Sequence, residues 1–229
     1  MKEVTHSNCM DEIVKIPDNS IDLIVIDPPY EINYNNESWD KKQLDWKFLF
    51  VEFNRMLKPT GNLIIFQGWS NVCETITIGE QYFTLNNWII YDRIKGRGAK
   101  RNLVSTREDI LWFIKSNDYT YNKIYSTIKK KTGGLGKKNN QECRALSNVF
   151  TDISPIVPWS KERVGHPTQK PIQLLERLIT IFSNENDIVL DCFAGSGTTG
   201  VAAKNLNRQY ILIEQSEEYI EIIRDRLAN

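Results

Sequence analysis

The sequence predicts an α/β fold in which a mostly parallel sheet is covered by helices. Residues 21–26 and 188–190 are short apolar runs of the kind that form strands buried on both faces of a parallel sheet. Apolar residues recur at helical spacing over residues 172–182, and a glycine-rich turn leads from the second run into a further helical stretch. Strands that alternate with helices in this way are typical of parallel α/β sheets.

The remaining elements follow from local patterns and from the Pro, Gly and Asn residues between them. The expected strands are residues 4–6, 61–67, 88–94, 109–115 and 210–213, with a weaker pattern over 119–125. The expected helices are residues 9–15, 46–57, 71–81, 201–206 and 217–227. Pro155, Pro158 and Pro167 predict a loop before the helix at 172–182.

Composition indicates one domain over residues 1–229, because 41% hydrophobic and 25% charged residues suffice for an α/β core. The four cysteines are far apart and lack a CxxC pair, and the two histidines lie in different motifs, so no disulfide framework or metal site is expected. The N-terminus lacks a signal-peptide pattern, and no apolar run approaches the ~18 residues of a membrane span. We therefore expect a cytoplasmic protein without a membrane segment.

The net charge of zero conceals a segregation of charge along the chain. Residues 93–144 contain 14 Lys and Arg and four acidic residues, a net charge of +10, so the rest of the chain carries −10. Two basic clusters interrupted by glycine suit contacts with nucleic-acid phosphates, although a solvated loop explains the second cluster equally well. The candidate DNA-binding residues are Arg93, Lys95, Arg97, Lys100 and Arg101 in the first cluster and Lys129, Lys130, Lys131, Lys137 and Lys138 in the second.

The tetrapeptide Asp27, Pro28, Pro29 and Tyr30 directly follows the apolar run 21–26, at the strand end where open α/β sheets bind ligands. The two prolines remove backbone donors and leave carbonyl oxygens free as acceptors. An exocyclic amine of a nucleobase suits this set, because Asp27 and the Pro28 carbonyl can accept its two hydrogens while Tyr30 stacks on the ring. Such acceptors localise the nitrogen lone pair, which can then attack an electrophilic methyl group. A surface turn is the bland alternative.

A glycine-rich loop follows the second apolar run. Gly195, Gly197 and Gly200 match the dinucleotide fingerprint, and Glu214 follows the next strand at the distance of a ribose ligand. NAD is disfavoured because the sequence after this loop has room for one crossover and a final helix, not for a second mononucleotide half. The loop opens with Asp191, whose carboxylate suits a cationic sulfonium amino acid. A methyl donor with adenosine, ribose and methionine parts therefore fits better.

Together these motifs resemble a known family. The order of DPPY, HPTQKP at residues 166–171 and FAGSGTT at residues 193–199 is similar to that of DNA amino-methyltransferases with the circularly permuted, or beta, motif order. The likeness extends over residues 20–30, 88–95, 107–115 and 166–226. It implies a Rossmann-like S-adenosylmethionine-dependent methyltransferase fold, with a seven-stranded, mostly parallel sheet and helices on both faces.

The resemblance also implies roles for individual residues. Glu214 would bind the ribose hydroxyls, and Phe193 would lie beside the methionine part. Thr168 and Lys170 would help at the carboxylate end of the donor. The full set expected around S-adenosylmethionine is Asn8, Asp27, His166, Thr168, Lys170, Asp191, Phe193, Ala194, Gly195, Ser196, Gly197, Thr198 and Glu214.

Three residues, at two places in the sequence, depart from the family pattern. Cys192 stands where the family usually has Pro, and we interpret it as a small packing residue because free cysteine behaves as a hydrophobe. Ser7 and Asn8 stand near the position of an acidic Gly-Asp pair. The amide of Asn8 can still hydrogen-bond an adenine edge.

The implied function is transfer of a methyl group from S-adenosylmethionine to the N6 amine of adenine in a short sequence of double-stranded DNA. The target base would be flipped out of the helix. Asp in the first position of the tetrapeptide is typical of adenine-specific members, whereas Ser is typical of those that methylate the cytosine N4 amine. Cytosine N4 stays an alternative, as do a catalytically silent scaffold that binds the donor or DNA, and RNA as the substrate.

The resemblance implies partners as well. Residues 116–151 would form a small basic target-recognition insert, and a companion restriction endonuclease would make the protein part of a restriction-modification system. Related enzymes often pair as homodimers, so a homodimer is one expectation. Four aromatic residues, Trp46, Phe48, Phe50 and Phe53, could contribute to such an interface, and core packing explains them equally well.

Overall fold

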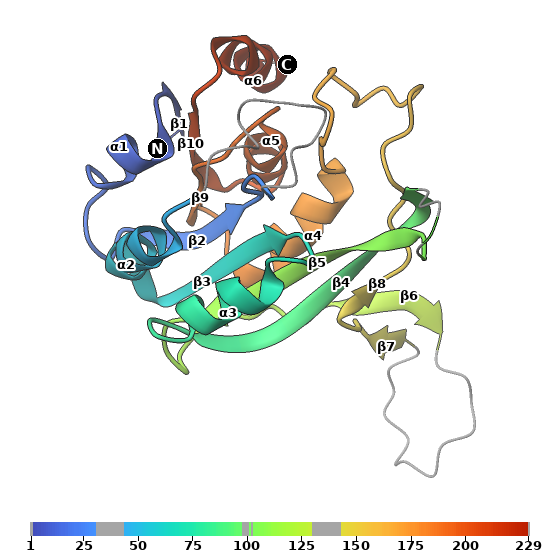
Figure 1. The fold of residues 1–229 in the computed structure, drawn as a ribbon, viewed down its shortest axis with the longest axis horizontal. Coiled ribbons are helices and arrows are strands. Elements are labelled where there is room, and N and C mark those ends of the chain that lie inside the picture. The colour runs from blue at the N-terminus through green and yellow to red at the C-terminus, as the bar shows by residue number, and fades with distance from the viewer. Residues whose placement is uncertain (1, 31–43, 98–100, 102, 130–142, 229) are drawn as a thin grey trace.

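The computed structural model describes residues 2–30, 44–97, 101, 103–129 and 143–228, which form a sheet with helices on both faces (Figure 1). The strands are β1 (Lys2–His6), β2 (Ile21–Ile26), β3 (Leu57–Gln67), β4 (Thr84–Arg97), β5 (Ser105–Ile114), β6 (Tyr125–Lys129), β7 (Cys143–Ala145), β8 (Val149–Phe150), β9 (Ile188–Asp191) and β10 (Gln209–Glu214). The helices are α1 (Cys9–Ile13), α2 (Trp46–Met56), α3 (Val72–Gly79), α4 (Ile172–Phe182), α5 (Thr198–Asn205) and α6 (Glu217–Ala228).

The main sheet has the strand order β1-β10-β9-β2-β3-β5-β4-β8. The first five strands in this order are parallel, β5 is antiparallel to both β3 and β4, and β8 is parallel to β4. The predicted α/β architecture is confirmed, but the predicted count of seven strands is wrong by one. The eighth strand, β8, has only two residues, which is too short to leave a periodic pattern.

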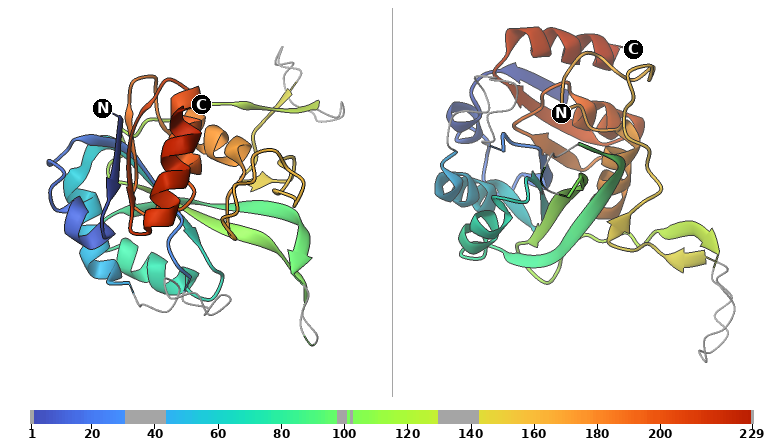
Figure 2. Two further views of the ribbon diagram at one scale, coloured as in Figure 1. Left: turned by 90° about the horizontal axis from the view of Figure 1, so that it is seen from above. Right: turned by 45° about the vertical axis from the view of Figure 1, so that its right-hand side comes forward.

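Side chains of the central strands alternate between two hydrophobic cores, one on each face of the sheet. Leu23 and Val25 pack in the core beneath α4, α5 and α6, whereas Ile24 and Ile26 pack in the core beneath α1, α2 and α3. Figures 1 and 2 show the two groups of helices on opposite faces. Because both faces of β2 are buried, its residues read as a continuous apolar run, as the sequence predicts.

Helix boundaries show where the sequence patterns were reliable. The helix predicted over residues 172–182 is confirmed with the same bounds, since its apolar stripe packs fully against the sheet. The aromatic residues of α2 mostly belong to the core: Trp46, Phe50 and Phe53 are buried. Of the two alternatives for this strip, core packing is therefore confirmed for these three residues.

The weak strand pattern over residues 119–125 is wrong, because a strand begins only at Tyr125. The segment is held as a loop instead. The side-chain amide of Asn62 donates to the carbonyl of Thr120 at 2.9 Å, and Tyr121 stacks on Trp112 with ring centroids 5.8 Å apart. These tertiary contacts override the local strand propensity.

Beyond this loop, β6 and β7 pair as a separate two-stranded ribbon that projects from the body of the protein (Figures 1 and 2). Its base is anchored, because Ile124 and Leu146 pack against the core on the α4 side of the sheet. Throughout the described ranges, the helices are too short or too polar to cross a membrane.

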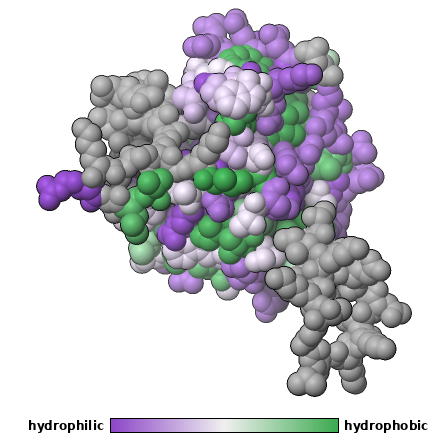
Figure 3. Space-filling view, turned by 90° about the vertical axis from the view of Figure 1, so that its right-hand side faces the viewer, coloured by the Kyte–Doolittle hydropathy of each residue, from purple (hydrophilic) through white to green (hydrophobic). Residues whose placement is uncertain are grey.

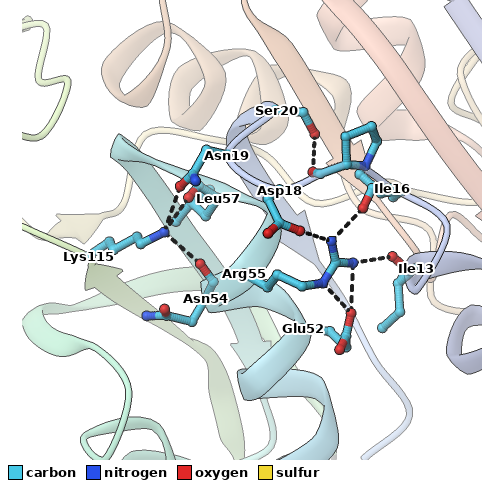
Figure 4. A network of polar contacts seen from close by, with 11 residues as sticks. Ile13, Ile16, Asp18, Asn19, Ser20, Glu52, Asn54, Arg55, Leu57 and Lys115 are labelled. Atoms are coloured by element: carbon cyan, nitrogen blue, oxygen red, sulfur yellow. Dashed lines mark hydrogen bonds and ion pairs between the residues drawn. The ribbon is translucent and has the colours of Figure 1, made fainter.

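A polar network fixes the amino end of β2, at the opposite edge of the sheet from the predicted ligand site (Figure 4). The guanidinium of Arg55 donates to the carbonyl oxygens of Ile13 and Ile16, at 3.1 and 2.7 Å, and pairs with Asp18 and Glu52. Nearby, Lys115 donates to the last carbonyl groups around the end of α2. This network joins the loop before β2 to α2.

Candidate active site

The motifs that are far apart in the sequence meet around one cavity of about 740 Å³. It lies at the carboxyl ends of the parallel strands, with Asp27 after β2, Asp191 at the end of β9 and Glu214 at the end of β10. Because β2 pairs with β9 and β9 pairs with β10, these three carboxylates come to one edge of the sheet. The predicted convergence of the motifs is thereby observed.

All but one of the residues predicted to surround the donor line this cavity. The exception is Gly197, the N-cap residue directly before α5, which has the left-handed conformation at φ 75°. A side chain there would meet Ile223 of α6 at 2.8 Å, so this glycine serves the packing of the loop. Of the tetrapeptide, Asp27 and Pro29 line the cavity. Asn8 lies at its edge, where its side-chain oxygen caps α1 by accepting the N–H of Met10 at 2.9 Å.

Glu214 fixes the glycine-rich loop against the end of β10. One of its carboxylate oxygens accepts the N–H of Gly195 and the other accepts the N–H of Ser216, each at 2.8 Å. Burial raises the pKa of the carboxyl, while these N–H groups favour the charged form. Gly195 itself has φ 51°, and a side chain there would come within 3.1 Å of the His166 ring. The loop can therefore pass close to His166 only because residue 195 is glycine.

Asp191 is a buried carboxyl group at the start of the same loop. It accepts the N–H of Phe193 at 3.0 Å and the hydroxyl of Thr199 at 2.5 Å. Burial raises its pKa to about 7. Among the residues that the structure describes, no cationic side chain forms an ion pair with it. An acidic group of this kind on a cavity wall is chemically matched to a positively charged ligand.

The arginine of α6 holds the other end of the loop. Arg226 donates to the carbonyl oxygen of Ser196 at 2.6 Å and to the hydroxyl of Thr198 at 3.1 Å. The ring of Tyr219, also in α6, lies 4.5 Å from that of His166 and lines the cavity. Sequence reasoning missed both residues, because only the docking of α6 brings them to the loop.

His166 is a neutral wall of the cavity. Burial lowers its pKa to about 4, and the charges of Lys170 and Arg226 act in the same direction. The backbone N–H of Thr168 donates to Nδ1 of His166, with 3.3 Å between the two nitrogens, so Nδ1 is an acceptor. The HPTQKP segment is thus folded back on itself beside the loop.

Asp27 has a hydrogen-bond donor on each of its oxygens. Tyr30 donates its phenolic O–H to Oδ1 at 2.7 Å, and the ammonium of Lys170 donates to Oδ2. Burial raises the pKa of Tyr30 well above its usual value, and the charges of Asp27 and Glu108 add to this effect. The phenol therefore stays protonated and donates to the carboxylate. Asn71 holds the Tyr30 backbone by donating to its carbonyl oxygen at 2.8 Å.

Lys170 faces a second carboxylate that sequence reasoning missed. Its Nζ lies 3.4 Å from Oε2 of Glu108, which extends from β5. Burial alone would lower the pKa of this lysine, but Asp27 and Glu108 outweigh burial and raise it. The side chain predicted to serve the carboxylate end of a donor thus lies against two acids of the protein. Glu108 had no motif to mark it, because the antiparallel pairing of β5 with β3 and β4 places it there.

The candidate DNA-binding residues are only partly described. Arg93 is directed inward, with a 19% exposed side chain, 3.5 Å from Oε1 of Glu108, whereas Arg101 is exposed. Lys95, Arg97 and Lys129 lie on the backbones of β4 and β6, and their side chains are not described. Lys100, Lys130, Lys131, Lys137 and Lys138 lie outside the described residues.

Comparisons with known proteins identify the family of this chain. The family model N6_N4_Mtase, described as DNA methylase, matches residues 21–225. The chain is 37% identical over 232 residues to the Type II methyltransferase M.HpaI of Haemophilus parainfluenzae, covering 96% of this chain and 72% of that protein. It is 36% identical over 244 residues to the DNA adenine methyltransferase YhdJ of Escherichia coli (strain K12), covering 99% of this chain and 82% of the other.

Solved structures give the same result. The M1.HpyAVI–SAM complex superposes with a TM-score of 0.69 and 29% identity, covering 99% of this chain and 100% of that one. The cytosine-N4-specific PvuII DNA methyltransferase has a TM-score of 0.71, over 99% of this chain and 86% of the other, but at 19% identity it shows the fold alone. By sequence and by structure, the chain belongs to the DNA methylase family.

Proposed function

We propose that this protein transfers a methyl group from S-adenosylmethionine to the exocyclic N6 amine of adenine, at a specific short sequence of double-stranded DNA. The observation that carries the proposal is the Asp27 carboxylate, hydrogen-bonded to Tyr30 and placed at the cavity that Asp191 and Glu214 line. The similarity to a DNA adenine methyltransferase supports adenine as the base. The fold alone does not distinguish the adenine from the cytosine amine, because the PvuII enzyme shares it.

The residues present fit S-adenosylmethionine. The cavity of about 740 Å³ lies within the usual range of ligand sites, about 300 to 1,000 Å³. The buried carboxyl of Asp191 suits the positive charges of the donor, and the Glu214 oxygens keep lone pairs for ribose hydroxyls beside the N–H groups they already accept. Phe193 and Tyr219 add aromatic wall.

When bound, S-adenosylmethionine supplies an electrophilic methyl group, whose bond to sulfur breaks with its electron pair left on sulfur as the new bond to nitrogen forms. The protein's contribution is to align the amine and to accept its hydrogens. Asp27 and the carbonyl of Pro28 would each accept a hydrogen bond from one N–H of the amine, and the ring of Tyr30 would stack on the base. The proton released from nitrogen would pass to Asp27 or to water. None of these steps requires a covalent intermediate with the protein.

Contacts with DNA must stabilise the flipped base by a few kcal/mol. We assign this role to the basic residues of the two clusters other than Arg93, which is directed inward against Glu108. We assign target recognition to residues 116–151, of which the β6–β7 ribbon projects from the body. Figure 3 shows the face that carries this ribbon, with hydrophobic side chains across its middle among hydrophilic ones. Exposed Ile94, Leu103 and Val104 lie at the adjoining ends of β4 and β5.

The likeness to Type II methyltransferases supports a role in restriction-modification, with a companion endonuclease that cuts the unmethylated sequence. A homodimer stays a proposal that sedimentation at several concentrations would test. The DNA substrate favours the cytoplasmic location expected from the sequence.

The test is mass spectrometry of nucleosides from unmethylated DNA incubated with S-adenosylmethionine and either the intact protein or Asp27→Ala. Asp18→Ala, an exposed acid in the network at the far edge of the sheet, is the control. N6-methyladenine with the intact protein and the control, but not with Asp27→Ala, is the expected result. Detection of N4-methylcytosine instead would show that the target is the cytosine amine and not the adenine amine. Donor binding without any methylated base would support a silent scaffold, unless RNA is methylated in a parallel incubation.

A further inference from the structure

Asp27 is occupied in this structure in a way that conflicts with its proposed role. The ammonium of Lys170 lies in close contact with Oδ2, the oxygen that the phenol of Tyr30 leaves open. A positive charge at this point neutralises the carboxylate and repels the positive charge that develops on the amine nitrogen during methyl transfer. The ammonium must therefore leave Oδ2 before the carboxylate can act fully on a base.

Glu108 offers a second position for this ammonium. Its Oε2 lies 3.4 Å from the Lys170 Nζ, and it is buried without a well-formed hydrogen bond to any described residue. Its other oxygen faces the Arg93 guanidinium at 3.5 Å. A buried carboxylate oxygen without a full partner is costly, and an approaching ammonium would satisfy it.

Among the residues that the structure describes, Asp27 and Glu108 are the two carboxylates beside the ammonium of Lys170. Its side chain is 9% exposed, and its Nζ lies over the ring of Phe66 at 5.2 Å and that of Tyr30 at 5.8 Å. Within the described ranges, the charged and titratable groups that face it are Asp27 and the protonated phenol of Tyr30 from the end of β2, Glu108 and its partner Arg93 from β5 and β4, and neutral His166. The aromatic faces tolerate the ammonium during a short movement between the acids.

We propose that Glu108 is a positioning residue that takes the ammonium of Lys170 away from Asp27 when the target base enters. The amine of the base then hydrogen-bonds to the freed Oδ2, and the ion pair of Lys170 with Glu108 keeps the site neutral overall. The inference rests on the proposed function. It predicts that Glu108 controls the rate of methyl transfer and not the affinity for the donor.

The experiment measures single-turnover methylation of DNA by the preformed complex of protein and S-adenosylmethionine, together with the donor dissociation constant. Glu108→Gln should transfer the methyl group about 10- to 100-fold more slowly than the intact protein, with the donor affinity unchanged. The matched control is Glu52→Gln. The Glu52 and Glu108 side chains are 14% and 15% exposed and each faces an arginine, but Glu52 lies in the network at the far edge of the sheet.

A second pair of variants separates this role from a structural one. If Glu108 acts only by holding the ammonium, Glu108→Gln should have no further effect in a Lys170→Met background, and the double variant should be faster than Glu108→Gln alone. The double variant lacks the whole ion pair. Its comparison with Lys170→Met therefore tests the role of Glu108 even if Glu108→Gln alone does not fold. The methylation rate of Glu108→Gln should also rise at alkaline pH. Loss of the glutamate charge lowers the pKa of Lys170, and the neutral amine that forms no longer neutralises the Asp27 carboxylate.

Equal slowing by Glu108→Gln in the presence and absence of Lys170 would overturn the proposal, as would full activity of Glu108→Gln. Failure of the proposed function is distinguished in the same experiment, because the intact protein would then methylate no adenine at all.

Discussion

The phenolic O–H of Tyr30 donates to Oδ1 of Asp27 at 2.7 Å, within the tetrapeptide that follows the central strand β2. This hydrogen bond fixes the direction of the carboxylate before a base arrives. If the ring of Tyr30 stacks on the base as proposed, the tyrosine has two separable tasks, because its hydroxyl orients Asp27.

Substitutions at this pair should therefore have graded effects. Asp27→Asn removes the charged acceptor and should lower the single-turnover rate by about 10²- to 10⁴-fold. Tyr30→Phe keeps the ring and loses one hydrogen bond, worth about 1 kcal/mol, and should lower the rate by about 3- to 10-fold. Tyr30→Ala should be clearly slower than Tyr30→Phe. A loss in Tyr30→Phe as large as that in Asp27→Asn would show that orientation is not the role of the hydroxyl.

Donor binding should depend on pH through Asp191. Burial raises the pKa of Asp191 to about 7, whereas its ordinary value is 3.8. Between these two pH values the folded protein holds a proton that the unfolded chain has released. The contribution of this carboxyl to stability is therefore full below the ordinary value and lost as pH rises through about 7. A cationic donor favours the ionised form, so its affinity should rise with pH up to about 7 and then level off.

Calorimetric titration in two buffers with different ionisation enthalpies would measure the affinity and the proton released. Glu214 also has a raised pKa, so Asp191→Asn is needed to isolate the effect. This variant should bind the donor more weakly and show a flatter pH dependence. An unchanged pH dependence in Asp191→Asn would assign the titration to another group.

The close approach of Gly195 to His166 should be essential for the donor site. Gly195→Ala would place a Cβ 3.1 Å from the His166 ring, in addition to the cost of φ 51°, and should weaken donor binding by about tenfold or more. Gly165→Ala is a matched control, because its φ is also positive at 94° but its Cβ would have no heavy atom within 4 Å. It should cost stability without a comparable loss of donor affinity. Equal losses in both variants would implicate backbone strain alone.

The network in Figure 4 should support stability without affecting the donor site. Arg55→Ala leaves the carbonyl oxygens of Ile13 and Ile16 and the carboxylate of Glu52 without their donor. We expect a loss of about 2–4 kcal/mol in the free energy of unfolding, measured in urea, with donor affinity unchanged. Arg55→Lys should restore only part of this loss, because one ammonium cannot reach all of the acceptors. A decrease in donor affinity equal to that of Asp191→Asn would contradict the separation of the two ends of the sheet.

The sequence predicted the architecture, and it brought together most of the residues that line the cavity, because both rest on local signals. Strand β2 is apolar on both faces, α4 has a clear helical stripe, and the motifs stand directly at strand ends, so the topology of a parallel sheet brings them together. The strand β8 and the loop at residues 119–125 could not be predicted in this way. Their structure depends on tertiary pairing, with β4 in one case and with Asn62 and Trp112 in the other.

The residues missed at the site are also those that only tertiary structure delivers. Glu108 lies on an antiparallel strand whose pairing partners cannot be read from its own pattern. Tyr219 and Arg226 are not among the buried apolar residues of α6, so the helical pattern does not mark them. Lys170 was found through its motif but assigned to the donor, because the second carboxylate beside it was unknown. Motif positions were thus predictable, whereas the charges that surround them were not.

The most direct test of the account is to follow an isotopically labelled methyl group from S-adenosylmethionine into DNA, with the intact protein and Asp27→Asn compared at equal donor occupancy. We expect label on the N6 of adenine with the intact protein and a loss of about 10²-fold or more with Asp27→Asn, although both bind the donor. Equal labelling by the two proteins, or label on a base atom other than an exocyclic amine, would contradict the central role of Asp27.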